Sequence, residues 1–233
     1  MLRRAAAVLL VLLAVPSALS AGCGGKVEAP LKEKASNSPP QPAGGEASPH
    51  AADVIMNGRS VMSAWVEHWG YTWEGPVEKH GYAIDFRELD SSDIPGSFAA
   101  NVENLLPGTI AFFKYCFEDF DGSNLEQREL EVKEVIAEAR GKGLRLIIGN
   151  ALPVRRQDGR PEMLEEYRDF NAFLEAKAAG DPNVWVFDFY VVLAGADGFL
   201  KPEYATEDSH PNQKAYAQLD RSFFPLLDTI TGG

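Results

Sequence analysis

Short hydrophobic runs alternate with stretches of helical periodicity from Asp53 to the end of the chain. The run at 109–113 shows no alternation of apolar and polar positions, as is typical of a strand buried on both faces of a sheet. We predict five strands, at 54–56, 82–84, 109–113, 144–148 and 184–189. We predict helices between and after them, at 60–69, 98–106, 124–140, 161–178 and 211–227. Because strands separated by helices pair in parallel, the pattern predicts one α/β domain with a five-stranded parallel sheet and helices on both faces.

The loop after the first strand contains a candidate nucleophile. In parallel sheets, ligands bind beyond the carboxyl ends of the strands, so the loops there are expected to carry the chemistry. The first such loop reads Asn57-Gly58-Arg59-Ser60. A serine at a strand-to-helix turn can present its hydroxyl above the sheet, with its own N–H pointing into the same space. The alternative is that Ser60 only caps the helix that follows.

A candidate base precedes the last predicted helix. His210 is followed by Pro211, and two acids, Glu207 and Asp208, stand three and two residues before it. A carboxylate beside a histidine selects the imidazole tautomer and stabilises the imidazolium that forms when serine gives up its proton. The alternative is a surface histidine in an acidic loop.

These two segments together resemble the SGNH (GDSL-like) hydrolase family, with a serine after the first strand and an acid-x-x-His-Pro segment before the final helix. The resemblance spans residues 54–227 and implies a flavodoxin-like, three-layer domain that hydrolyses esters through a serine acyl-enzyme. It implies Ser60 as the nucleophile and His210 as the general base. The family spacing favours Glu207 as the orienting acid, and Asp208 is the adjacent alternative.

The resemblance is incomplete at the oxyanion hole. It implies the backbone N–H groups of Ser60 and Gly96 as oxyanion donors, together with an asparagine after the third strand. At that place the chain has Cys116-Phe117-Glu118-Asp119, without asparagine. A missing donor typically costs about 10²–10³ in rate. Lys114 could supply a compensating charge, or it could pair with Glu118 or Asp119.

Three functions therefore stay open. The first is ester hydrolysis, with an acyl-ester small molecule or an O-acylated, for example O-acetylated, polysaccharide as substrate. The second is acyl transfer to a sugar hydroxyl by the same residues. The third is a catalytically impaired domain that binds a glycan or an envelope partner. A serine mechanism needs no metal and no organic cofactor.

The first fifty residues differ in kind from the rest. Arg3 and Arg4 precede an apolar run, 5–15, that is too short to span a bilayer and is typical of a secretory signal. The segment Leu19-Ser20-Ala21-Gly22-Cys23 resembles the bacterial lipobox. We therefore predict a lipoprotein signal peptide at 1–22, a lipidated Cys23 that begins a disordered, Pro- and Ser-rich tether at 23–52, and an SGNH-like domain at 53–233.

Charge restricts the partners. The chain has 22 Lys and Arg against 34 Asp and Glu, a net charge of −12, and residues 51–233 alone carry −14 because the first fifty carry +2. Such acidity argues against nucleic acid and against electrostatic docking on anionic lipid. We expect an exported bacterial lipoprotein, on the periplasmic side or at the outer membrane, that contacts the membrane through its lipid anchor only.

The cysteine count predicts no intrachain disulfide. With Cys23 lipidated, Cys116 is the one cysteine left. It ends an apolar run, which favours a buried structural thiol over a nucleophile.

The lipid anchor is testable by substitution. Cys23→Ala removes the acyl acceptor, so the protein should move from the membrane fraction to the soluble fraction on cell fractionation. A variant that stays in the membrane fraction would contradict the lipobox assignment.

Overall fold

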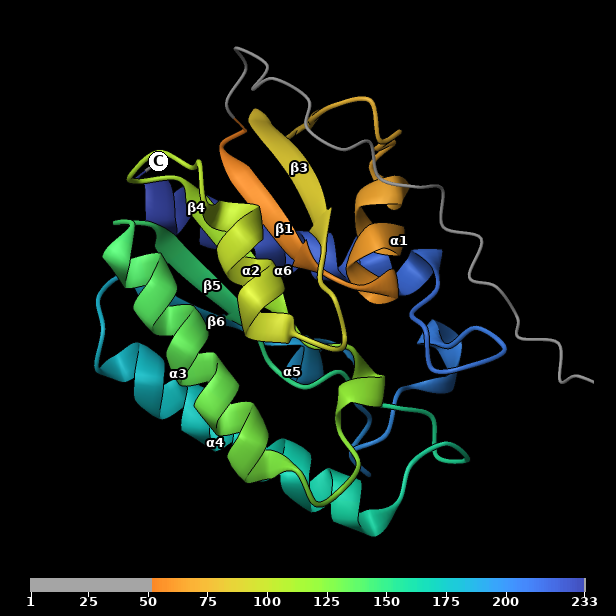
Figure 1. Cartoon of the computed structure of the whole chain (residues 1–233). Coiled ribbons are helices and arrows are strands. Elements are labelled where there is room, and N and C mark those ends of the chain that lie inside the picture. The colour runs from red at the N-terminus through yellow and green to blue at the C-terminus, as the bar shows by residue number, and fades with distance from the viewer. Residues whose placement is uncertain (1–51, 233) are drawn as a thin grey trace, which may run out of the picture. The chain divides into compact units, whose positions relative to one another are not determined.

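The computed structural model describes residues 52–232 (Figure 1). The predicted signal peptide, Cys23 and nearly all of the tether lie outside the described residues and stay predictions. Within residues 52–232, no helix has the length and apolar character needed to cross a membrane.

A six-stranded sheet with the order β2-β3-β1-β4-β5-β6 forms the centre of the fold. All five predicted strands are present and parallel; they are β1 (Val54–Gly58), β3 (Tyr82–Glu88), β4 (Ile110–Lys114), β5 (Arg145–Gly149) and β6 (Val184–Phe187). Counted by themselves, these strands have the 2-1-3-4-5 order of flavodoxin-like sheets. The sixth strand, β2 (Val77–Lys79), pairs antiparallel with β3 at the edge. The hydrophobic pattern does not indicate β2, because only one of its three residues is apolar.

Helices cover both faces of the sheet, which gives the predicted three layers (Figure 1). One face is covered by α1 (Ser60–His68), α5 (Phe189–Leu193) and α6 (Gln213–Thr231). The other is covered by α2 (Ile94–Val102), α3 (Leu125–Gly141) and α4 (Pro161–Ala179). Two 3₁₀ turns, η1 (Phe117–Asp119) and η2 (Pro202–Tyr204), lie in the loops. Every position of β1 and β4 is buried, as expected for strands between two helical layers.

The second helix begins four residues before its predicted start at 98. Asp93 is its N-cap, and the Asp93 carboxylate accepts the backbone N–H of Gly96 at 3.0 Å. Because a capped first turn tolerates Pro95 near its start, the helix extends back over Ile94-Pro95-Gly96-Ser97.

Helices α1 and α6 are joined by a carboxylate within a cluster of aromatic rings, and hydrogen bonds between His68 and Gln213 and from Tyr216 to the Val61 carbonyl also link them. Asp220 of α6 accepts the indole N–H of Trp65 at 2.8 Å and that of Trp69 at 2.9 Å. Trp65 is fully buried and its ring packs against Phe223 of α6, with 5.1 Å between ring centroids. Since α1 begins at Ser60 and α6 follows His210, this contact sets the relative position of the two residues.

Gly58 gives α1 the space to start directly beyond β1. Its backbone is not in the left-handed region, so conformational freedom is not the reason for glycine here. A Cβ at this position would lie 2.3 Å from Met62 Cγ and 2.8 Å from Met62 Cβ. The close approach of the α1 side chain to the end of β1 therefore requires a residue without a side chain.

Gly58→Ala should destabilise the domain by about 1–3 kcal/mol, because the added methyl overlaps Met62 and pushes α1 away from β1. Urea unfolding measures the change. Gly141→Ala is the matched control, since a Cβ at this helical glycine meets nothing within 4 Å; its stability should stay the same or rise slightly. Equal stability of Gly58→Ala and wild type would contradict the steric argument.

Candidate active site

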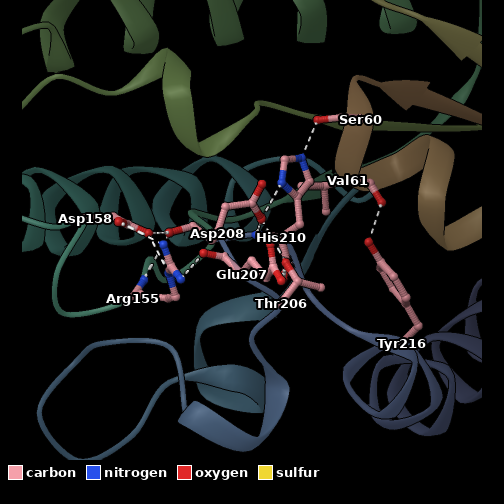
Figure 2. A network of polar contacts seen from close by, with 10 residues as sticks. Ser60, Val61, Arg155, Asp158, Thr206, Glu207, Asp208, His210 and Tyr216 are labelled. Atoms are coloured by element: carbon pink, nitrogen blue, oxygen red, sulfur yellow. Dashed lines mark hydrogen bonds and ion pairs between the residues drawn. The ribbon is translucent and has the colours of Figure 1, made fainter.

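The structure brings Ser60 and His210 together, although they are 150 residues apart in the chain (Figure 2). Ser60 is the first residue of α1, at the carboxyl end of β1, and His210 lies in the loop before α6. The distance from His210 Nε2 to Ser60 Oγ is 2.8 Å. Ser60 is exposed, so its hydroxyl is open to a ligand at this edge of the sheet.

The carboxylate beside His210 is that of Asp208, and not that of Glu207, which the family spacing favoured. Asp208 Oδ1 lies 2.9 Å from His210 Nδ1. The one contact of Glu207 in this network is its backbone carbonyl, which accepts a hydrogen bond from Arg155 (Figure 2). Ser60, His210 and Asp208 therefore form a continuous chain of hydrogen bonds, and the Glu207 carboxylate takes no part in it.

A tight turn places Asp208 on Nδ1. Ala205 and Pro211 form a β-bridge, and within the turn the backbone N–H of Thr206 donates to the carbonyl of His210 at 3.1 Å. Asp208 Oδ1 also accepts the His210 backbone N–H and the Thr206 hydroxyl, each at 2.8 Å. These hydrogen bonds lower the pKa of Asp208 to about 2, and the one from the His210 backbone has the largest effect. The carboxylate therefore stays ionised and able to orient an imidazolium.

A second layer of polar contacts supports this turn from the loop after β5 (Figure 2). The Asp158 carboxylate accepts the hydroxyl of Ser209 at 2.7 Å and the Arg155 guanidinium at 2.7 and 3.1 Å. The backbone N–H of Arg155 donates to Ser209 Oγ at 3.1 Å. Ser209 is buried, so the segment between Asp208 and His210 is attached to the neighbouring loop. Sequence patterns did not indicate these residues, because their pairing crosses about fifty positions.

Of the two expected backbone donors to the oxyanion, one is available and the other is not. The backbone N–H of Ser60 has no acceptor among the described residues and lies at the positive end of α1. The backbone N–H of Gly96, by contrast, donates to the Asp93 carboxylate as part of the α2 cap. Gly96 is therefore not an available donor, and this part of the prediction is wrong.

Two buried asparagines at the carboxyl ends of strands, Asn57 and Asn150, do not take the place of the missing asparagine. The Asn57 amide nitrogen donates to the carbonyls of Ile55 at 3.2 Å and Phe112 at 3.1 Å. The Asn150 amide nitrogen donates to Asp188 at 2.8 Å, and its oxygen accepts the backbone N–H of Tyr190 at 3.1 Å. Both amides thus serve the fold and leave the oxyanion to backbone donors.

The segment that replaces the asparagine block is tied to the site in another way. Arg59, next to Ser60, donates to Asp119 at 2.5 Å, and Asp119 accepts the backbone N–H of Cys116 at 2.6 Å. The Phe117 ring packs edge-on against His210, with 5.2 Å between the ring centroids. These contacts hold the 116–119 turn against both the serine and the histidine.

Lys114 and Cys116 are buried beneath the site. The Lys114 ammonium donates to the carbonyl of Tyr115 at 2.7 Å and lies 4.9 Å from the centre of the Phe189 ring. It forms no ion pair with Glu118 or Asp119, which bind Arg59 instead. Cys116 is buried and unpaired, and burial raises the pKa of its thiol, the opposite of what a nucleophilic cysteine needs. Among residues 52–232 no cluster of three His, Cys, Asp or Glu side chains could hold a metal.

Comparisons with solved structures place the fold among the SGNH/GDSL-like hydrolases. A GDSL-like lipase from Bacteroides thetaiotaomicron matches with a TM-score of 0.59 and 17% identity, over 76% of this chain and 87% of the lipase. A member of the lipolytic G-D-S-L family from Veillonella parvula matches with a TM-score of 0.53 and 21% identity, over 74% and 96% of the two chains.

The fold is also found in a protein that is not named as a hydrolase. The OSK domain of Drosophila Oskar matches with a TM-score of 0.55 and 14% identity, over 78% of this chain and 89% of that domain. No protein-family model and no curated protein matches the chain. The chain thus has an SGNH-like α/β fold, and its activity has to be argued from the site.

The environment of Lys114 predicts a pH-dependent stability. Burial lowers the pKa of its ammonium from 10.5 to about 8, so the folded state opposes protonation. The buried ammonium therefore lowers the free energy of unfolding. This loss of stability is complete below pH 8, and it disappears as the pH rises toward 10.5, where the lysine of the unfolded chain also loses its proton. Lys114→Met should therefore raise the free energy of unfolding by roughly 2–3 kcal/mol at pH 7, and this gain should vanish near pH 10.5.

Chemical denaturation at the two pH values measures the effect. Lys133→Met, at a half-exposed lysine on α3, is the control and should change stability by less than about 0.5 kcal/mol at either pH. A Lys114→Met variant less stable than wild type at pH 7 would refute the argument.

Proposed function

We propose that this protein is a serine ester hydrolase. The single observation that carries the proposal is the hydrogen-bonded chain from Ser60 Oγ through both nitrogens of His210 to Asp208. These groups occupy the carboxyl edge of a parallel sheet, where such folds bind their ligands. The SGNH-like fold supports the same activity.

The proposed reaction uses these groups in two steps. With the imidazole proton on Nδ1 held by Asp208, Nε2 of His210 accepts the Ser60 proton as Oγ attacks the acyl carbonyl. The imidazolium then gives this proton to the leaving alcohol as the C–O bond breaks, which leaves an acyl-serine. Water, activated by the same nitrogen, hydrolyses the acyl-serine and restores the hydroxyl. No metal or organic cofactor enters either step.

The oxyanion would be stabilised mainly by the Ser60 backbone N–H at the start of α1. Because Gly96 and the two buried asparagines are committed elsewhere, this hole has fewer donors than the family pattern implies. Each missing oxyanion donor typically lowers the rate by about 10²–10³, so we expect slow turnover of simple esters. Acylation of Ser60 should still be detectable, because nucleophile and base are already in contact.

For the substrate we propose an O-acylated carbohydrate of the cell envelope. The lipobox-like segment before Cys23 and the family resemblance support this class. If the acceptor is a sugar hydroxyl in place of water, the same residues perform acyl transfer.

A second candidate function is binding without turnover. The absence of an available amide donor at the oxyanion position favours it, as does the fold's occurrence in a domain not named as a hydrolase. The two candidates differ in one property, which is whether Ser60 reacts with acyl groups.

Labelling by a fluorophosphonate probe and release of p-nitrophenol from p-nitrophenyl acetate test the proposal. Ser60→Ala should abolish labelling, because the nucleophile is gone. His210→Ala and Asp208→Asn should each lower the labelling rate by roughly 10²–10⁴, since the base or its orienting charge is lost. Wild type that is neither labelled nor faster than Ser60→Ala would overturn the hydrolase proposal in favour of binding.

The adjacent acid provides a matched control. Glu207→Gln makes the same change of charge one residue away, and it should leave the labelling rate within about twofold of wild type. Equal losses in Glu207→Gln and Asp208→Asn would show that the loop's net charge matters rather than the contact with Nδ1. The ratio of free acetate to acetylated sugar, measured with an added sugar acceptor, separates hydrolysis from transfer.

A further inference from the structure

A cavity of about 560 Å³ adjoins the loop that carries Asp208 and His210. Its walls come from the loop after β5, the segment after α5 and the residues just before Asp208. Its volume is within the range of small-molecule sites. One wall residue, Thr206, donates to Asp208 at 2.8 Å, so the cavity and the proposed catalytic loop share a residue.

The charge of the cavity is opposite to that of the domain. Its lining contains three cationic residues, Arg155, Arg156 and Lys201, against one acid, Asp197; Asp158, just outside the lining, pairs with Arg155 and reduces the local excess to one positive charge. This local excess of positive charge stands in a region, 51–233, whose net charge is −14. An anionic ligand that is repelled elsewhere on this surface would therefore be favoured here.

The three cations differ in how they are engaged. The Arg155 guanidinium is occupied by Asp158 and by the Glu207 carbonyl, so it supports the loop. The Lys201 ammonium donates to the carbonyl of Val192 at 3.2 Å, which leaves two of its three protons for other acceptors.

Arg156 is the cation best placed to bind a carboxylate. Its guanidinium stacks over the Phe199 ring, 4.8 Å from the ring centre, and one of its nitrogens donates to Asp197. Phe199 packs closely against Gly159, because a Cβ added to that glycine would lie 2.8 Å from the ring. The side chains of Arg156 and Asp197 are 69% and 46% exposed, and an ion pair this exposed contributes little energy. A ligand carboxylate can therefore replace Asp197 at small cost on a guanidinium that the ring already orients.

We propose that this cavity binds the carboxylate of a uronic-acid unit, and that the glycan bound by this protein is anionic. The inference rests on the proposed function for its link to catalysis, because it specifies the carbohydrate whose acyl group would reach Ser60. Arg156 would hold the carboxylate through paired N–H groups, with Lys201 adding charge and the Gln157 side chain available to a sugar hydroxyl.

Binding of trigalacturonate to the purified full-length chain, measured by titration calorimetry, tests the inference. We expect saturable binding at least tenfold tighter than that of neutral galactotriose, and weaker binding in 0.5 M NaCl. Arg156→Gln should weaken trigalacturonate binding about tenfold or more, as expected for the loss of a charge-assisted contact. Arg221→Gln, which removes the same charge from an exposed position on α6, should leave the affinity unchanged.

Three results would overturn the inference. The first is equal affinity for trigalacturonate and galactotriose, and the second is equal weakening by Arg156→Gln and Arg221→Gln. The third is Arg156-dependent binding of phosphatidylglycerol vesicles without binding of trigalacturonate, which would make the ligand a lipid phosphate. Fluorophosphonate labelling of Ser60 separates this outcome from that of the proposed function. Labelling without trigalacturonate binding leaves the hydrolase proposal and removes this one; binding without labelling does the reverse.

Discussion

The site depends on the joint between α1 and α6. One carboxylate oxygen of Asp220 accepts both indole N–H groups of Trp65 and Trp69 in an interface rich in aromatic rings, where contacts from His68 and Tyr216 add further hydrogen bonds. Hydrogen bonds in such surroundings are strong and directional, and their loss would leave buried polar groups unpaired. Ser60 is the first residue of α1 and His210 lies in the loop before α6. The contact between these two helices therefore brings Ser60 and His210 within hydrogen-bond distance of each other.

Near the contact between α1 and α6, two carboxylates orient the polar groups of the loop that carries His210. Asp208 receives three hydrogen bonds on one oxygen, and Asp158 receives the arginine and serine that anchor the same turn. In a domain with a large excess of acid, these carboxylates are stabilised by local donors rather than by a favourable overall field. Arg155 supports this turn, while the neighbouring Arg156 and Lys201 line the cavity beside it. Adjacent cations thus stabilise the loop and, in the proposed site, attract an anionic ligand.

The replacement of the asparagine block changes what this fold can do. The turn at 116–119 is held by an arginine beside the serine and by an aromatic contact with the histidine, so the shape of the site persists without the amide donor. The proposed nucleophile Ser60 and the proposed base His210 stay in hydrogen-bond contact, and fewer donors remain for the proposed oxyanion.

Local physics in the sequence determined the fully buried strands β1 and β4, because such strands read as nearly unbroken apolar runs. It also indicated Ser60 and His210 as candidates, because both stand in loops expected at the carboxyl edge of the sheet. Only the tertiary structure decided which acid contacts His210. Glu207 and Asp208 differ by one position, and the Thr206–His210 turn, closed by hydrogen bonds, directs the second onto Nδ1. The tertiary structure also excludes Gly96 as an oxyanion donor, because its N–H donates to the Asp93 carboxylate. It also shows the edge strand β2, which the hydrophobic pattern does not indicate. These features depend on where backbone donors and side-chain acceptors meet in space, and no spacing along the chain encodes that.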